Sequence, residues 1–130
     1  MTPGDSGLVL VADDNKGIRE TISLILRDEG YEVVEAKDGE EALAKLATAS
    51  FDVALLDVRM PITDGTSVVE ALIPGPPPPG VVMVTAYEIG DDIRAKLGAK
   101  VYKYMRKPVA PVQLIDVVRE AAMLTKRAGR

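Results

Sequence analysis

Five polar residues stand at or just after the ends of short apolar runs, and their side chains suit a metal ion and a phosphoryl group. They are Asp13, Asp14, Asp57, Thr85 and Lys107. Three carboxylates at one place would repel one another without a cation, and carboxylate oxygens are ligands that suit Mg²⁺. A lysine ammonium adds a point charge for a phosphoryl oxygen, and a threonine hydroxyl adds a hydrogen-bond donor. The combination predicts a site for a phosphoryl group beside a metal ion.

Each of these residues, taken alone, has a more ordinary explanation. An aspartate after a strand often caps a helix or opens a turn, which would account for Asp13, Asp14 or Asp57 singly. Thr85 could be an ordinary β-branched strand residue, and Lys107 a solvated charge before a loop. Their common position at the ends of apolar runs is what favours the chemical interpretation.

Elements that could position these residues are visible as five alternations of an apolar run and an amphipathic segment. At least three runs are continuously apolar, which is typical of strands buried on both faces of a parallel sheet. The expected strands are Leu8–Ala12, Glu32–Glu35, Val53–Leu56, Val81–Val84 and Val101–Met105. Apolar residues at helical spacing predict helices around residues 18–26, 42–47, 68–72, 89–97 and 111–122.

This alternation predicts an α/β fold, a doubly wound (βα)₅ sheet with helices on both of its faces. In such a sheet the carboxyl ends of the strands meet at one edge, where ligands bind. We therefore expect the polar residues that follow the strands to converge at that edge.

The composition excludes several kinds of chemistry. The chain of 130 residues has no histidine and no cysteine, so imidazole ligands, thiolates, histidine-activated nucleophiles and disulfides are absent. It has 20 acidic and 16 basic residues, and the net charge of −4 argues against broad contact with a nucleic-acid backbone. No apolar stretch approaches the ~20 residues of a membrane span, and residues 1–10 lack the pattern of a signal peptide. We expect a cytoplasmic protein.

As a set, these motifs resemble the receiver domain of two-component response regulators, of the chemotaxis-regulator type. The resemblance rests on Asp13-Asp14, on Asp57 within the segment LLDVRMP, on Thr85-Ala86 and on Lys107-Pro108. It extends from about residue 7 to residue 124, so we expect one receiver domain over residues 1–130. The family implies a flavodoxin-like fold, with a five-stranded parallel sheet of order 2-1-3-4-5.

The resemblance implies a role for each acidic residue. Asp57 would be the phosphoacceptor, taking a phosphoryl group from a phosphohistidine. Mg²⁺ would bind directly to Asp14, to Asp57 and to the backbone carbonyl of Arg59, and to Asp13 mainly through water. With no histidine of its own, the chain is expected to receive the phosphoryl group rather than donate it.

The remaining roles concern the phosphoryl group and the response to it. Thr85 and Lys107 would bind phosphoryl oxygens, and the Lys107-Pro108 peptide bond would be cis. Tyr104 matches the aromatic switch position of the family, and with Thr85 it would pass the signal to the surface formed by the fourth helix, the fifth strand and the fifth helix.

The expected function is therefore a phosphorylation-driven switch and not a conventional enzyme, with only self-phosphotransfer and slow autodephosphorylation. Its partners would be a sensor histidine kinase or phosphotransfer protein and an unidentified output partner or effector domain. A phosphorylation-dependent homodimer is a further expectation. We expect this domain to contact neither nucleic acid nor a membrane.

Two alternatives stay open. A Mg²⁺-dependent phosphatase of the haloacid-dehalogenase type also uses an aspartate nucleophile, but that family has an Asp-x-Asp pair after its first strand, where this chain has Asp13-Asp14. A flavin or nucleotide carrier of the same fold would need a glycine-rich phosphate loop, which is missing, and stacking aromatics, which make up only 4% of the chain.

Two features depart from the family pattern, and a third expectation concerns the last strand. Gly98-Ala99 comes early relative to Lys107, which predicts an early end to the fourth helix or a remodelled loop after it. The proline run over 74–79 is expected to be a stiff surface connection, with a polyproline ligand as the alternative. Strand alternation should bury one side of the segment 102–106.

Overall fold

The computed structural model of the chain describes residues 7–60, 64–71, 79–86 and 88–129. Within them, five strands form one parallel sheet in the order β2-β1-β3-β4-β5. The strands are β1 (Gly7–Ala12), β2 (Tyr31–Ala36), β3 (Val53–Asp57), β4 (Gly80–Thr85) and β5 (Val101–Arg106). The predicted fold class and strand order are confirmed, and each strand boundary lies within one residue of its expected position.

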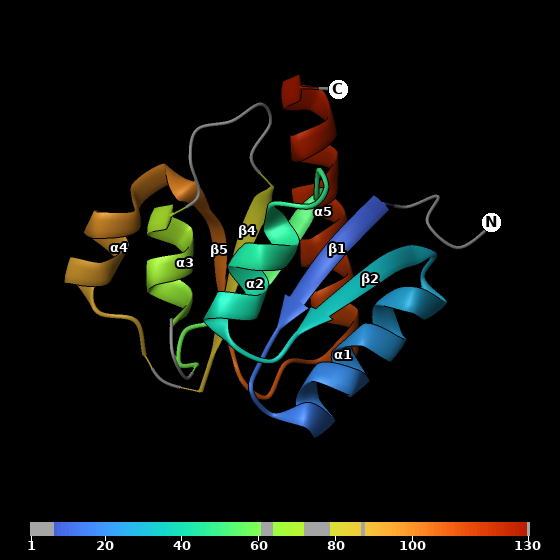
Figure 1. Cartoon of the computed structure of the whole chain (residues 1–130), viewed down its shortest axis with the longest axis horizontal. Helices are drawn as coiled ribbons and strands as arrows, with labels where there is room; N and C mark the ends of the chain where they lie inside the picture. The colour runs from blue at the N-terminus through green and yellow to red at the C-terminus, as the bar shows by residue number, and fades with distance from the viewer. Residues whose placement is uncertain (1–6, 61–63, 72–78, 87, 130) are drawn as a thin grey trace.

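The helices lie on both faces of the sheet, as the doubly wound arrangement requires. They are α1 (Lys16–Asp28), α2 (Gly39–Leu46), α3 (Gly65–Ala71), α4 (Asp91–Leu97) and α5 (Pro111–Gly129). Helices α1 and α5 cover one face, and α2, α3 and α4 cover the other (Figure 1). None of the helices in the described part of the chain combines the length and apolarity needed to cross a membrane.

The core consists of two apolar layers separated by the sheet. Successive residues of a strand point to opposite faces, so Val9 of β1 packs in the layer of α1 and α5 while Leu10 packs in the other layer. Both side chains are fully buried, as are Val53 and Ala54 of β3. This two-sided burial explains why the central strands have continuously apolar sequences.

The edge strand β5 differs from simple alternation. Val81 of β4 pairs with Val101, but Val82 pairs with Lys103, so the extra residue Tyr102 lies at a bulge. Tyr102 and Lys103 are both exposed as a result. Farther along the segment Tyr104 is half-buried, Met105 is buried and Arg106 is exposed, so the burial of one side that alternation predicted is present only in part.

The end of α4 agrees with its early glycine. The helix ends at Leu97, and Gly98 follows with φ of 53°, a left-handed conformation that favours glycine. A short 3₁₀ turn, Gly98–Lys100, then leads into β5. The helix thus ends at the residue before the Gly98-Ala99 pair, and this pair forms part of the turn that follows. The interpretation of the proline run falls almost wholly on residues 72–78, which lie outside the described residues.

A close backbone contact joins α3 to the end of β3. The backbone N–H of Gly65 donates to the carbonyl of Val58 at 3.0 Å. A Cβ atom on Gly65 would lie 2.2 Å from the carbonyl oxygen of Asp57. The first turn of α3 therefore packs directly on the backbone that carries Asp57, and only a residue without a side chain fits there.

This contact predicts that Gly65→Ala is destabilising, by about 1–3 kcal/mol in the free energy of unfolding, because the added methyl group displaces the Asp57 backbone. Urea denaturation followed by circular dichroism measures the change. The matched control is Gly17→Ala in α1, where a new Cβ would lie 3.5 Å from Oδ1 of Asn15, an ordinary van der Waals distance. That variant should keep its stability or gain up to about 1 kcal/mol from higher helix propensity. Equal stabilities for the two variants would contradict the close-packing argument.

Candidate functional site

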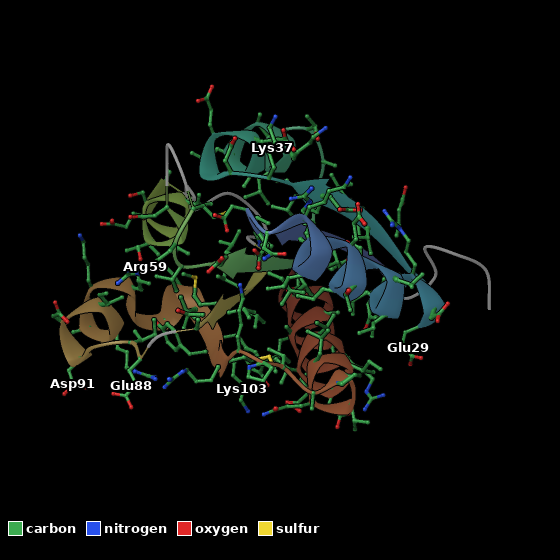
Figure 2. All side chains as sticks on the ribbon, turned by 90° about the horizontal axis from the view of Figure 1, so that it is seen from below. Glu29, Lys37, Arg59, Glu88, Asp91 and Lys103 are labelled. Carbon is green, nitrogen blue, oxygen red and sulfur yellow. The ribbon has the colours of Figure 1, made fainter. Side chains whose placement is uncertain are left out.

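Three carboxylates meet at the carboxyl edge of the sheet. Asp13 and Asp14 follow β1, and Asp57 is the last residue of β3, the neighbour of β1 in the sheet. One carboxylate oxygen from each residue lies within 4.8 Å of the others. Asp13 and Asp57 are buried, with exposed fractions of 2% and 8%, whereas Asp14 is exposed. Figure 2 views the molecule from this edge, which is the lower edge of Figure 1.

Lys107 reaches this group from the loop after β5. Its Nζ lies 2.7 Å from Oδ2 of Asp13 and 3.3 Å from Oδ2 of Asp57. The backbone N–H of Lys107 donates to the carbonyl of Thr85 at 2.8 Å, which fixes the loop against the end of β4. The Lys107-Pro108 peptide bond is cis, as the resemblance implied. Lys107 was expected to bind phosphoryl oxygens, and its bridge between the two buried carboxylates is an additional contact that the sequence did not predict.

The acidic group carries more negative charge than Lys107 neutralises. Burial and the charge of Asp13 raise the pKa of Asp57, and they outweigh Lys107 and the N–H of Arg59, which act in the opposite direction. Burial lowers the pKa of Lys107, but its hydrogen bond to Asp13 and the charges of both carboxylates leave that pKa above its ordinary value. Three carboxylates face one ammonium. A divalent cation bound by oxygen ligands would balance this excess of negative charge.

The backbone around Asp13 is held from several sides. Its N–H donates to the carbonyl of Ala36 on β2 at 3.1 Å, and its Oδ1 accepts from the N–H of Asn15 at 2.9 Å. Its carbonyl oxygen accepts from Nη1 of Arg19 at 2.8 Å. Both carboxylate oxygens of Asp13 are therefore engaged, one by Asn15 and one by Lys107. This contact of Arg19 could not be predicted from the sequence, because nothing in the spacing of the residue shows where its long side chain will turn.

Arg59 and Thr85 lie beside the carboxylates. The N–H of Arg59 donates to Oδ1 of Asp57 at 3.3 Å, so its peptide turns toward the acidic group. The Arg59 side chain is exposed at the same edge (Figure 2). Thr85 ends β4 next to β3 and is 2% exposed. The structure thus brings together every residue that the sequence placed at the site, while their roles stay predictions.

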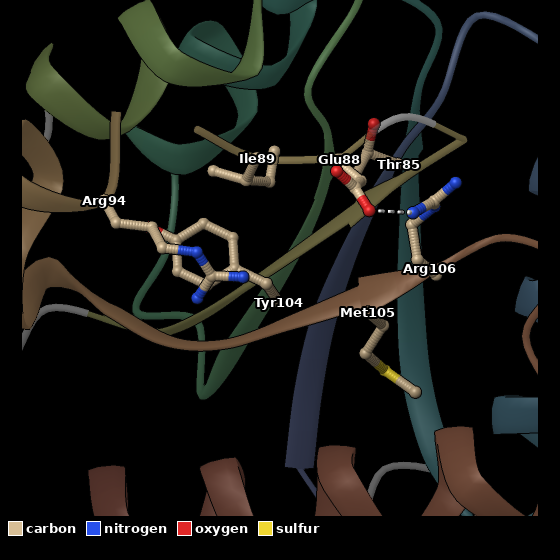
Figure 3. A pocket seen from close by; sticks show the side chains of 7 residues that line it. All are labelled: Thr85, Glu88, Ile89, Arg94, Tyr104, Met105 and Arg106. Atoms are coloured by element: carbon tan, nitrogen blue, oxygen red, sulfur yellow. Dashed lines mark ion pairs between the residues drawn. The ribbon is translucent and has the colours of Figure 1, made fainter. Parts of the chain in front are cut away.

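Tyr104 lies in a pocket on the other side of Thr85. The pocket has a volume of about 250 Å³. It is lined by Thr85, Glu88, Ile89, Arg94, Tyr104, Met105 and Arg106. The Arg94 guanidinium covers the Tyr104 ring, with its carbon 4.5 Å from the ring centroid (Figure 3). Among the described residues, the buried Tyr104 hydroxyl has no hydrogen-bond partner. An unsatisfied buried hydroxyl costs about 1–3 kcal/mol, so the ring is held here by packing and by Arg94 and not by a hydrogen bond of its hydroxyl.

A second hollow, of about 600 Å³, lies between α1 and the beginning of α5. Lys107 forms part of its wall, together with apolar residues such as Ile18, Ile22 and Val109. An apolar groove thus opens directly beside the acidic group.

Comparison with known sequences connects this geometry to a family. A family model described as the response regulator receiver domain matches residues 9–119. The transcriptional regulatory protein PrrA of Mycobacterium tuberculosis is 37% identical over 121 residues, which cover 93% of this chain and 51% of PrrA. The transcriptional regulatory protein ResD of Bacillus subtilis is 35% identical over 124 residues, covering 94% of this chain and 49% of ResD. The chain therefore spans about half the length of these relatives.

Solved structures agree in fold. A CheY-like receiver domain protein of Methanospirillum hungatei has a TM-score of 0.83 and 31% identity, covering 94% of this chain and 98% of that protein. The chemotaxis protein CheY4 of Vibrio cholerae has a TM-score of 0.77 and 30% identity, covering 93% and 99% of the two chains. The similarity extends over nearly the whole length of both proteins.

Proposed function

The chain belongs to the family of response regulator receiver domains, and on this premise we propose that Asp57 accepts a phosphoryl group from a phosphohistidine. The donor would be a sensor histidine kinase or a phosphotransfer protein. The observation that carries the proposal is the position of Asp57, buried at the sheet edge with two further carboxylates within 4.8 Å and the Lys107 ammonium 3.3 Å away. The apolar groove beside Lys107 supports it, since a protein donor could bury apolar surface next to the acceptor.

The donor set fits Mg²⁺. Asp13, Asp14 and Asp57 offer hard oxygen ligands, and the exposed Asp14 leaves room for the waters that Mg²⁺ usually retains. We propose that Asp14, Asp57 and the carbonyl of Arg59 hold the ion directly, with Asp13 acting mainly through water. When bound, Mg²⁺ would neutralise charge on the phosphoryl group during transfer.

The other roles in the proposed transfer belong to Asp57, Lys107 and Thr85. A carboxylate oxygen of Asp57 forms the new bond to phosphorus while the bond from phosphorus to the donor imidazole nitrogen breaks, and the electron pair of that bond returns to the imidazole. Lys107 already lies beside Asp57, so it can bind a phosphoryl oxygen without a large movement. The hydroxyl of Thr85 is proposed to bind a second phosphoryl oxygen.

The output is proposed to leave through the surface of α4, β5 and α5. An unidentified partner, an effector region or a second copy of the chain in a phosphorylation-dependent dimer would read that surface. PrrA and ResD are named as transcriptional regulatory proteins, and control of transcription through a further region is one form that the output would take. A cytoplasmic location and a single domain over residues 1–130 remain predictions.

Phosphorylation of the chain tests the proposed function. Incubation with acetyl phosphate and Mg²⁺ should add one phosphoryl group, seen by intact-protein mass spectrometry, and Asp57→Asn should gain none. Asp64→Asn is the matched control, because Asp64 is exposed and an asparagine keeps its capping bond to the N–H of Ser67. Phosphorylation of Asp57→Asn at the wild-type rate would contradict the assignment. Repeated turnover of a phosphomonoester would instead favour the phosphatase alternative.

We further propose that Thr85 and Tyr104 form the switch. Both line the same pocket, and phosphorylation would add acceptor oxygens that draw the Thr85 hydroxyl toward Asp57. That movement would change the space beside Tyr104, whose hydroxyl has no polar partner in the described structure to hold it. The hydrogen bond between Thr85 and the phosphoryl group would supply the difference in free energy between the two states.

This switch predicts a change at Tyr104 when beryllofluoride and Mg²⁺ mimic the phosphorylated state. The ring resonances of Tyr104 should shift in wild type, shift less in Thr85→Ala, and recover in Thr85→Ser, which keeps the hydroxyl. Nuclear magnetic resonance with labelled tyrosine measures this, and Tyr102 provides an internal comparison outside the pocket. Identical Tyr104 shifts with and without beryllofluoride would show that Tyr104 only packs.

A further inference from the structure

We propose that Arg19 is a positioning residue, whose guanidinium fixes the peptide between Asp13 and Asp14 and so sets the geometry in which the acidic group binds a divalent cation. The inference rests on the proposed function, because it concerns the same metal site. Arg19 lies on α1, outside the set of residues assigned above to the metal or to the phosphoryl group.

The guanidinium of Arg19 is held at two points. Its Nη1 donates to the carbonyl oxygen of Asp13 at 2.8 Å, and its Nε donates to Oε1 of Glu35 at 3.1 Å. Only 14% of the Arg19 side chain and 27% of the Glu35 side chain are exposed. Because the guanidinium is planar and rigid, binding Glu35 with one nitrogen fixes where the other nitrogens point. Glu35 thus aims Arg19 at the Asp13 carbonyl.

Anchoring the carbonyl of Asp13 also restricts the orientation of Asp14. The peptide bond keeps the carbonyl of Asp13 and the N–H and Cα of Asp14 in one plane, so an anchored carbonyl also orients Asp14. Asp14 is the exposed member of the acidic group. The two buried members are held by Lys107, which bonds to both side chains. Arg19 would do for the backbone of Asp14 what Lys107 does for the side chains of Asp13 and Asp57.

The pairing of β1 with β2 fixes the position of Glu35 relative to Asp13. Glu35 lies on β2 opposite Val11 of β1, and the ladder continues to the bond between the Asp13 N–H and the Ala36 carbonyl. Glu35 is therefore fixed relative to the beginning of the acidic loop, and the Arg19 bridge joins α1, β1 and β2 at that point.

Arg27 provides a natural control within the same helix. Its Nη1 lies 3.6 Å from Oε2 of Glu35, and its Nη2 donates to the carbonyl of Val33 at 3.1 Å. It shares the carboxylate partner of Arg19 and also joins α1 to β2. In the described part of the structure its contacts do not include the Asp13 carbonyl, so only Arg19 should affect metal binding.

The test is a titration of the metal-free protein with Mg²⁺. Nuclear magnetic resonance monitors binding through the backbone amide chemical shifts of Asp14 and Asn15. Removing a residue that orients a metal ligand typically weakens binding by 10–100-fold, so we expect Arg19→Ala to raise the dissociation constant by about 10-fold or more. Arg27→Ala should change it by less than about 2-fold, the range of an ordinary surface substitution. The amide shifts of Asp14 should also move in metal-free Arg19→Ala and stay unchanged in Arg27→Ala.

If Arg19→Ala does not fold, the conservative variants Arg19→Lys and Arg27→Lys provide the same test. Arg19→Lys retains a cation beside Glu35, but one ammonium cannot reproduce the two-point hold of the guanidinium, so Mg²⁺ binding should weaken more than in Arg27→Lys. Wild-type affinity in the Arg19 variants, or equal weakening in the Arg19 and Arg27 variants, would overturn the inference alone. A wild-type protein that does not bind Mg²⁺ would overturn both this inference and the proposed function.

Discussion

The contact of the Lys107 ammonium with two buried carboxylates is the interaction on which the functional edge of this fold depends. Asp13 and Asp57 lie at the ends of adjacent strands, at 2% and 8% exposure, where two negative charges repel strongly and lose their hydration. Lys107 offsets part of that cost through contacts of 2.7 and 3.3 Å. It does not offset all of it, since Asp14 adds a third carboxylate. The domain therefore holds an excess of negative charge at this edge, which a divalent cation would neutralise.

The scaffold keeps this unfavourable group in place. The fully buried strands β1 and β3 fix the backbones that lead to the carboxylates, and the glycine contact of α3 packs against the backbone of Asp57. The bond between the Lys107 N–H and the Thr85 carbonyl ties the lysine loop to the end of β4. By contrast, Tyr104 has a buried hydroxyl without a partner in the described structure and an arginine stacked on its ring. The proposed switch would need both features: a firmly held backbone at Asp57 and a Tyr104 hydroxyl without a hydrogen bond to hold it.

Much of this arrangement could be predicted from the sequence. Continuous apolar runs predict buried strands, and the carboxyl edge of a parallel sheet gathers the residues that follow them, so Asp13, Asp14 and Asp57 could be expected together. The strand order and the cis bond before Pro108 came from the family resemblance. The contacts of Lys107, Arg19 and Arg94 could not be predicted, because long side chains choose among rotamers according to partners on distant elements. The bulge in β5 was missed for a related reason, since residue alternation does not reveal the register between strands.

The most direct measurement of the central claim is the free energy of unfolding of wild type and Asp57→Asn, with and without Mg²⁺. Burial and Asp13 raise the pKa of Asp57 in the folded state, so its charge lowers stability as the pH rises through that folded pKa. Without metal at neutral pH, Asp57→Asn should be more stable than wild type, and the difference should shrink as the pH falls through the raised pKa of folded Asp57 and be absent below about 3.9, the ordinary carboxyl pKa. Saturating Mg²⁺ should stabilise wild type more than Asp57→Asn. A metal-free Asp57→Asn that is no more stable than wild type, together with a wild type indifferent to Mg²⁺, would contradict the claim that these carboxylates form an incomplete cation site.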